Sequence, residues 1–247
     1  MKGGYFVLLY YCYTNISNPN KFRENHHLFC INNNLKGRVI VSEEGINGTI
    51  SGKKNDCENY MKKIYSDKRF ENVEFKVSKH SKNVFNKLNV RLKNEIVNSG
   101  INNVDPNKLS GKYMEPQEFK TILKNKPKDV VILDIRSNYE YNVGKFKNAV
   151  TLDIENFREF QIKIDELKKY KNKKIITYCT GGVKCEKASG FLLKKGFKNV
   201  YQLHGGIIKY GIEEDGYDFD GKCYVFDDRL TVDINKSNPS IISTCYI

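Results

Sequence analysis

No stretch of this 247-residue sequence is apolar over the roughly 18–20 residues that a membrane-spanning helix needs, so a transmembrane protein is not expected. The first residues, MKGGYFVLLYYCY, are apolar but lack a small-residue cleavage site, and they are expected to form a strand and not a signal peptide. The 7 cysteines are odd in number and scattered, which does not resemble a secreted disulfide framework. A cytoplasmic protein is therefore expected.

Motifs for common redox cofactors are also missing. The segment GINGTISG lacks the spacing G-x-G-x-x-G and follows no strand–helix unit, so it does not predict a flavin or nicotinamide site. Only 4 histidines are present, whereas an iron site of two histidines and one carboxylate would need two of them brought together with an acid. The sequence therefore predicts neither a metal nor a flavin.

Acidic residues are scarce relative to basic ones, and the formal net charge is +13. Residues 1–100 hold 17 Lys and Arg against 9 Asp and Glu, a balance of +8, and the remaining 25 against 20 give +5. The segment 76–94, KVSKHSKNVFNKLNVRLKN, contains no acid. A basic N-terminal part favours a polyanionic partner, although a chain rich in Lys and Asn throughout would show the same balance.

The N-terminal part reads as strand, helix, strand, strand, helix, strand, the order of a ferredoxin-like fold. Helices are expected over 21–34 and 55–66, and the last strand over 73–77. Between them, strands 38–42 and 48–51 flank a hairpin turn in which Gly45 and the pair Asn47-Gly48 tolerate positive φ.

The C-terminal part alternates strands with helices, which predicts a parallel sheet covered on both faces. A helix is expected over 116–125 and another over 155–170, and DVVILDIR, KKIITYC and NVYQLHGG are the expected strands. The predicted division is 1–95 for the ferredoxin-like domain, 96–111 for a linker, 112–218 for the α/β domain and 219–247 for a C-terminal extension.

The strongest chemical signal is the segment IITYCTGGVKCEKA, where a buried strand ends at Cys179 and a glycine-rich loop leads into a helix. Converging N–H groups and the positive end of the helix both favour a thiolate, and an inward-turned Lys184 would reinforce this. The predicted active-site loop is Thr180, Gly181, Gly182, Val183 and Lys184. The plainer alternative is an inert buried cysteine in a chain turn.

The loop does not suit phosphate chemistry. A phosphatase loop of related shape needs an arginine six positions after its nucleophile, and that position is Cys185 here. The shorter loop suits a smaller group on sulfur, such as a persulfide. Cys185 itself is either a second, resolving thiol or a structural cysteine of the helix.

The segment LDIRSNYEYNVGKFKNAV resembles the rhodanese pattern D-x-R-x-x-x-E-x-x-x-G-H-I-x-G-A, and LHGGI resembles the closing segment of that fold. Asp134, Arg136 and Glu140 fill matching places and are expected to organise the fold. Together with LKGRVIVSEEGINGTISG, VFNKLNVRLKNEIVNSG, CTGGVKCEKASG and GKCYVFDDRL, these blocks resemble the tRNA uridine hydroxylase family across nearly the whole chain.

This resemblance implies oxygen-dependent formation of 5-hydroxyuridine at the wobble position of tRNA, uridine 34, with Cys179 as the catalytic residue and molecular oxygen as co-substrate. Either the thiolate adds to carbon 6 of uracil, or a persulfide or oxidised sulfur mediates the transfer. The electron donor is not indicated. The alternative is a plain sulfurtransferase that passes sulfane sulfur through a Cys179 persulfide.

The implied partner is the anticodon loop, whose unpaired bases can be splayed out for recognition. Candidate phosphate contacts are Lys76, Lys79, Lys82, Lys87, Arg91 and Lys93. Two departures from the family stand out: Lys184 replaces the usual arginine, which loses a planar donor fork, and the chain stops at SIISTCYI, where Cys245 alone predicts no zinc site. Cys223 is a further thiol that could face the active site.

Overall fold

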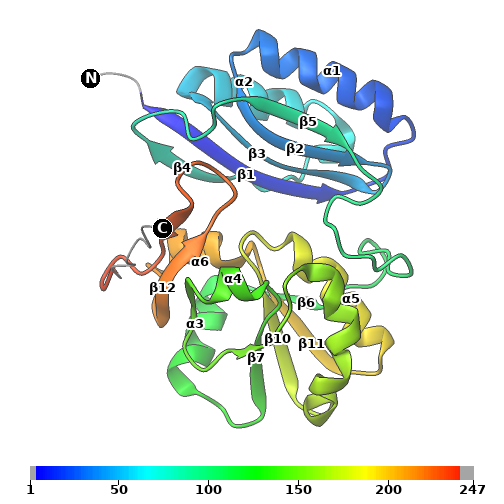
Figure 1. Ribbon diagram of the computed structural model, residues 1–247, viewed down its shortest axis with the longest axis vertical. Helices are drawn as coiled ribbons and strands as arrows, with labels where there is room; N and C mark the ends of the chain where they lie inside the picture. Colours follow the sequence, from blue (N-terminus) through cyan, green and yellow to red (C-terminus); the bar gives the residue numbers. More distant parts are fainter. Residues whose placement is uncertain (1–3, 240–247) are drawn as a thin grey trace. The chain divides into compact units, whose positions relative to one another are not determined.

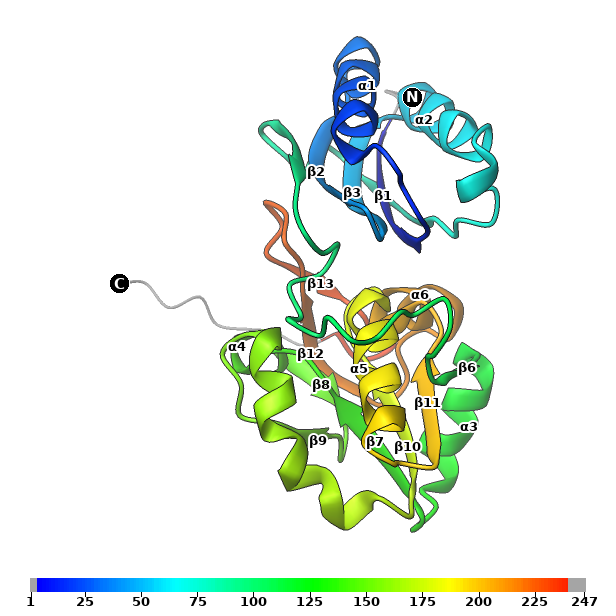
Figure 2. The same ribbon diagram turned by 90° about the vertical axis from the view of Figure 1, so that its right-hand side faces the viewer.

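The computed structural model describes residues 4–239 (Figures 1 and 2), and the chain divides into two compact units. Within the described residues, the first unit comprises 4–97 and 226–229, and the second comprises 98–225 and 230–239. Each unit has its own sheet and its own hydrophobic core.

The first unit contains, in chain order, β1 (Tyr5–Tyr13), α1 (Pro19–Asn32), β2 (Lys36–Ser42), β3 (Gly45–Lys53), α2 (Lys54–Tyr65), a 3₁₀ turn (Lys68–Phe70), β4 (Lys76–His80) and β5 (Leu88–Leu92). The sheet order is β4-β1-β3-β2-β5, so the predicted ferredoxin-like order of elements is confirmed. The edge strand β5, parallel to β2, was not predicted because it lies within the segment read as basic.

Both helices cover one face of this sheet (Figure 1). Side chains at alternate strand positions, such as Leu8, Tyr10, Val39 and Val41, are buried in the core beneath them. The helix-free face therefore carries the intervening residues of each strand.

The hairpin between β2 and β3 is tighter than expected. Ser42 pairs directly with Gly45, which leaves a two-residue turn, and Gly45 has φ +144°. The prediction that Asn47-Gly48 belongs to the turn is wrong, because both residues already pair with β2. Gly48 is instead required by close packing, since a Cβ there would lie 2.6 Å from the Tyr10 hydroxyl.

The second unit contains β6 (Lys112–Met114), α3 (Pro116–Asn125), β7 (Val130–Asp134), α4 (Asn138–Tyr141), β8 (Gly144–Phe146), β9 (Val150–Thr151), a 3₁₀ helix (Phe157–Tyr170), β10 (Lys174–Tyr178), α5 (Val183–Lys194), β11 (Asn199–Leu203), α6 (Gly206–Glu213), β12 (Phe219–Tyr224) and β13 (Thr231–Asp233). Its main sheet has the order β6-β11-β10-β7-β9 with all neighbours parallel, which confirms the predicted α/β class. The central strand β10 is the buried run KIITY.

Three segments of this unit differ from a simple alternation of strands and helices. Residues 157–170 wind as a 3₁₀ helix and not as the expected α-helix, with N–H groups bonded three residues back. The segment expected as a linker packs on α5, where Gly111 N–H donates to Ser189 Oγ at 2.7 Å. Strand β12 joins β8 and β13 in a small antiparallel sheet (Figure 2).

Candidate active site

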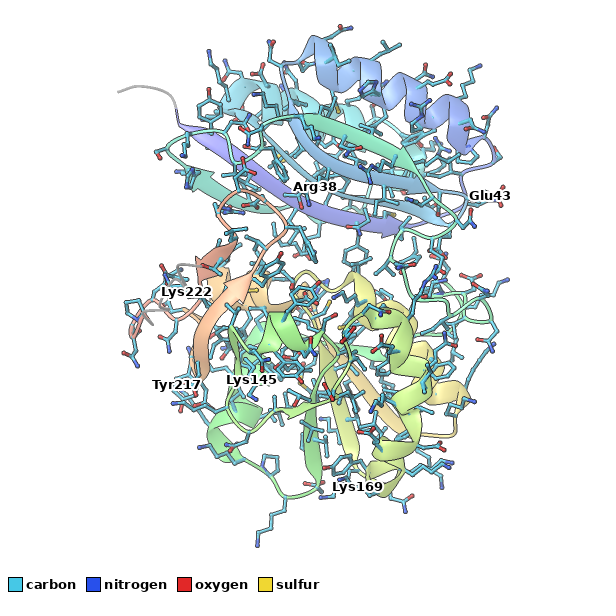
Figure 3. The ribbon with its side chains drawn as sticks, viewed as in Figure 1. Arg38, Glu43, Lys145, Lys169, Tyr217 and Lys222 are labelled. Atoms are coloured by element: carbon cyan, nitrogen blue, oxygen red, sulfur yellow. The ribbon has the colours of Figure 1, made fainter. Side chains whose placement is uncertain are left out.

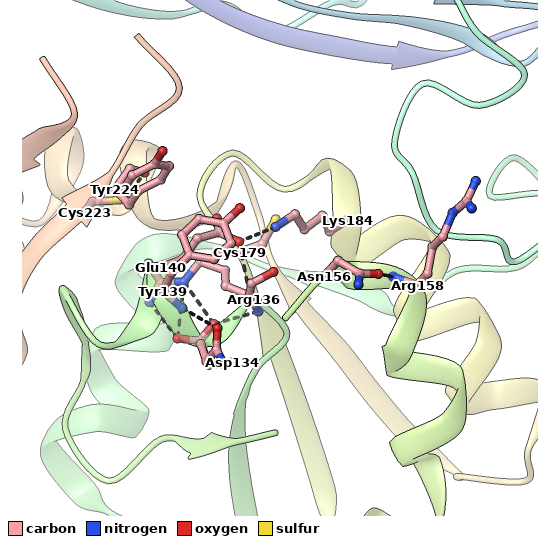
Figure 4. Close-up of polar contacts among 12 residues, drawn as sticks. Asp134, Arg136, Tyr139, Glu140, Asn156, Arg158, Cys179, Lys184, Cys223 and Tyr224 are labelled. Atoms are coloured by element: carbon pink, nitrogen blue, oxygen red, sulfur yellow. Dashed lines mark hydrogen bonds and ion pairs between the residues drawn. The ribbon is translucent and has the colours of Figure 1, made fainter. Parts of the chain in front are cut away.

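Cys179 lies directly after β10, at the edge where the carboxyl ends of the parallel strands meet (Figure 4). The first turn of α6 holds the loop from behind: Ile207 N–H donates to the Cys179 carbonyl at 3.0 Å, and Ile208 N–H donates to the Thr180 carbonyl at 3.1 Å. Backbone hydrogen bonds from α6 therefore help to fix the loop.

In the structure, the loop after Cys179 is shorter than predicted from the sequence. Gly182 caps α5 with φ +101°, so Val183 and Lys184 already form the first turn of the helix. Gly181 and Gly182 are both buried. Cys185 follows within α5, and its N–H donates to the Gly182 carbonyl at 3.0 Å. The helix N-terminus thus begins beside the sulfur, where it favours negative charge.

The structure favours the thiolate of Cys179. Its residue is only 1% exposed, and burial alone would raise the pKa. A hydrogen bond from the Cys185 thiol, the Lys184 ammonium and the N–H groups of Lys184 and Gly182 outweigh burial and lower the pKa from 9.0 to about 7. The Gly182 N–H lies 3.2 Å from Sγ.

Every other cysteine that the structure describes, residues 4–239, has a raised pKa. Burial raises the pKa of Cys12 and of Cys57 to about 11 and that of Cys30 and of Cys223 to about 12. Burial, together with the neighbouring Cys179, raises the pKa of Cys185 well above its ordinary value. All six described cysteines are free thiols, and Cys179 is the one poised to ionise near neutral pH.

Lys184 is turned inward, as its proposed role requires. Its Nζ lies 2.6 Å from Glu140 Oε2, and its side chain is 15% exposed. Burial would lower the pKa of Lys184, but Glu140 and then Cys179 raise it. The ammonium therefore stays charged between a buried carboxylate and the sulfur.

Glu140 has two roles, of which the sequence predicted only the first, an organising role in the fold. Its carboxylate accepts a hydrogen bond from Ser137 N–H at 3.0 Å and so caps the short helix α4, in keeping with the expected fold-organising role. The ion pair with Lys184 links it to the thiol as well. No local spacing joins positions 140 and 184, and only the pairing of β7 with β10 brings them together.

Asp134 and Arg136 form a fully buried pair below the loop. The guanidinium donates from Nε to Asp134 Oδ1 at 2.9 Å and from Nη2 to Oδ2 at 2.6 Å, and Nη2 also reaches the Gly144 carbonyl at 2.6 Å. The pair thus joins the end of β7 to the start of β8. Cys223 lies nearby on β12, where the Arg136 guanidinium counteracts part of the rise in the thiol pKa that burial causes.

Gly206 offers a test of loop positioning. It has φ +66°, and a Cβ there would lie 2.5 Å from the Cys179 carbonyl and 2.8 Å from Gly182 N. The substitution Gly206→Ala is expected to displace the loop and raise the pKa of Cys179, measured by the pH dependence of thiol alkylation. The control is Gly196→Ala at φ +82°, where the Cβ meets only the tip of the Lys171 side chain, and an unchanged thiol pKa is expected. Equal behaviour of both variants would contradict the assigned role of Gly206.

The candidate phosphate contacts fall into two groups. The side chain of Lys76 is 4% exposed, pairs with Glu74 at 3.7 Å and lies 5.0 Å from the centre of the Tyr11 ring, so it is withdrawn from the set. The remaining residues are exposed: Lys79, Lys82, Lys87, Arg91 and Lys93. The predicted last strand, 73–77, is found as β4 at Lys76–His80, and alternation along it, which buries Lys76 and exposes Lys79, was not foreseen from the sequence.

Within residues 4–239 no group of three or more His, Cys, Asp or Glu side chains is arranged to hold a metal ion. No helix of the same residues is both long and apolar enough to cross a membrane. The expectation about Cys245 concerns a position outside the described residues.

Family models assign the two parts of the chain to known classes. Residues 5–96 match the UPF0176 acylphosphatase-like domain, and residues 115–213 match the rhodanese-like domain. The chain thus combines an acylphosphatase-like module with a rhodanese-like module whose loop carries the cysteine of lowered pKa, Cys179.

Relatives that match nearly the whole of this chain identify its family. The chain is 60% identical over 243 residues to a tRNA uridine(34) hydroxylase of Cytophaga hutchinsonii, covering 98% of this chain and 77% of the relative. It is 46% identical over 250 residues to the enzyme of the same name from Bacillus licheniformis, covering 100% of this chain and 77% of that relative. The chain belongs to the tRNA uridine(34) hydroxylase family, which confirms the resemblance found in its sequence motifs.

Proposed function

We propose that this chain hydroxylates carbon 5 of uridine 34 in tRNA, with the Cys179 thiolate as its reactive group and molecular oxygen as co-substrate. The observation that carries the proposal is the lowered pKa of Cys179 in a chain 60% identical to a tRNA uridine(34) hydroxylase. A thiolate at neutral pH is the form of cysteine that attacks electrophiles.

The chemistry requires carbon 5 of the uracil ring to become electron-rich. Addition of the thiolate to carbon 6 would achieve this, because the negative charge then spreads to carbon 5 and the carbonyl at carbon 4. One oxygen atom would be added at carbon 5, and the other would leave as water after two electrons arrive from a donor and protons from the solvent. Loss of the proton at carbon 5 would then break the carbon 6–sulfur bond and release the Cys179 thiolate. A persulfide route would begin from the same thiolate, so both routes depend on the groups that lower its pKa.

Residues around the sulfur have distinct tasks in this proposal. Gly182 N–H and the Cys185 thiol donate hydrogen bonds to Sγ, and Lys184 balances the negative charge. Glu140 holds the ammonium of Lys184 at 2.6 Å. Glu140 is thus a positioning residue, which acts on the sulfur through Lys184.

The proposal is tested by mass spectrometry of tRNA nucleosides from a bacterial strain that lacks its own hydroxylation of uridine 34. Complementation with this gene is expected to restore 5-hydroxyuridine or its derivatives, while the empty vector restores none. A soluble protein that restores no hydroxylation, yet accepts sulfur from thiosulfate, would replace the proposal by a sulfurtransferase.

A further inference from the structure

The helix-free face of the first unit contains a hollow of about 460 Å³ between β2, β5 and the segment that precedes β5. Its lining includes Arg38, Ile40, Asn86, Lys87, Asn89 and Arg91. Figure 3 shows Arg38 on the side of the sheet opposite α1 and α2. The volume lies within the range of ordinary ligand sites, roughly 300–1,000 Å³.

Strand alternation explains why cations gather on this face. Val39 and Val90 point into the core beneath the helices, so their neighbours project from the opposite face. In the parallel register Arg38 lies beside Asn89, and Ile40 lies beside Arg91. The two arginines are therefore diagonal neighbours on adjacent strands.

Within residues 4–239, none of Arg38, Lys87 and Arg91 forms an ion pair. Arg91 Nε donates to Asn89 Oδ1 at 2.8 Å, which orients its guanidinium. Like charges on neighbouring strands repel each other unless an anion binds between them.

One acid also lines the hollow. Asp228 is held by its own contacts: its N–H donates to the Val84 carbonyl at 3.0 Å, and its Oδ2 accepts from Asn86 Nδ2 at 2.7 Å. A single carboxylate against three cations leaves a net positive charge. The apolar residues Val39, Ile40 and Phe85 also line the hollow.

We propose that this hollow binds the sugar–phosphate backbone of the RNA substrate, with Arg38 and Arg91 contacting phosphates. The assignment of RNA rests on the proposed function. Planar guanidinium groups match phosphate geometry, Asn86 and Asn89 suit the hydroxyls of ribose, and the apolar lining residues suit the sugar ring. The hollow is larger than one phosphate requires, and the +8 balance of residues 1–100 favours a polyanion.

The test measures binding of a labelled anticodon stem-loop, with uridine at position 34, by fluorescence anisotropy over a series of salt concentrations. The double variant Arg38→Gln/Arg91→Gln is expected to bind more weakly and to reduce the slope of log K against log salt by about 2, close to 1 per phosphate contact. The matched control Lys62→Gln/Lys63→Gln removes the same charge from exposed positions on α2. Its slope is expected to stay within about 0.5 of the parent value, on the same scale.

Further measurements separate this proposal from its alternatives. Arg38→Lys/Arg91→Lys keeps both charges and is expected to retain the parent salt slope. A reduced slope in the glutamine variant alone is then due to the lost charges and not to the replacement of the arginine side chains as such. Equal weakening by the α2 control would overturn the hollow as a specific site. Competition by uridine monophosphate at the affinity of the stem-loop would also overturn it, in favour of a small-nucleotide site.

The salt experiment is independent of hydroxylation. Failure of the parent chain to form 5-hydroxyuridine, with stem-loop binding still dependent on Arg38 and Arg91, would overturn the proposed function and leave RNA binding in place. Normal hydroxylation with an unchanged salt slope in the glutamine variant would overturn the hollow alone.

Discussion

Replacing Cys179 with alanine is expected to reduce hydroxylation of uridine 34 by at least about 10³-fold, on the scale observed when a covalent nucleophile is removed. Cys179 is the described cysteine whose pKa is lowered, so no neighbouring thiol can take its place at neutral pH. The loss is measured as 5-hydroxyuridine per uridine in tRNA from complemented cells, with protein levels checked in the same cultures.

The matched control is Cys12→Ala, which removes a thiol from β1 of the first unit. Burial raises the pKa of Cys12 to about 11, so this thiol is protonated under the assay conditions. Hydroxylation by the control is therefore expected to stay within about twofold of the parent level. A twofold change in rate corresponds to less than about 0.5 kcal/mol in the activation free energy. Full activity of the Cys179 variant would remove the cysteine from the mechanism.

Replacing Lys184 with methionine is expected to raise the pKa of Cys179 by about one unit or more, from about 7 toward 9.0. The thiolate is the reactive form, so alkylation of the parent rises with pH through about 7 and then levels off. In the variant the same rise occurs at higher pH. At pH 7 a shift of one unit lowers the thiolate fraction from about one half to about one eleventh, so the alkylation rate falls at least about fivefold. The measurement is the rate of iodoacetamide alkylation of Cys179, read by peptide mass spectrometry against pH.

Loss of Lys184 also leaves the buried Glu140 carboxylate without its cation, which costs about 3–5 kcal/mol of stability. The double variant Lys184→Met/Glu140→Gln removes both charges and is expected to recover much of that stability while the thiol pKa stays raised. Lys184→Arg keeps the charge and is expected to retain a low pKa. An unshifted alkylation profile in both methionine variants would contradict the electrostatic role of Lys184.

The regular parts of the fold could be predicted because their signals are local. The helix over 116–125 is found at Pro116–Asn125, where proline and a capping glutamate mark the start. The buried run before Cys179 forms the central strand β10. Strand β5 was missed because Leu88 and Val90 stand among Lys and Asn residues, and only pairing with β2 makes the segment a strand.

The candidate active site and the basic hollow likewise combine local features, which the sequence predicts, with long-range contacts, which it does not. Cys179 and its glycine loop form one continuous stretch of chain, so the lowered pKa of the thiol could be predicted from the loop and the helix that follows it. The pairing of Glu140 with Lys184 and the approach of Arg38 to Arg91 depend on strand neighbours far apart in the sequence. Lys76 was misassigned because its basic charge gave no sign of its burial beside Tyr11.

The most direct test of the central claim follows the oxygen atom itself. Cells that lack their own hydroxylation of uridine 34 are complemented with this gene or with its Cys179→Ala form and grown under ¹⁸O₂, and their tRNA nucleosides are analysed by mass spectrometry. The account predicts 5-hydroxyuridine that carries ¹⁸O with the parent gene and none with the variant. Hydroxylated uridine without ¹⁸O, or labelled equally with both genes, would contradict it.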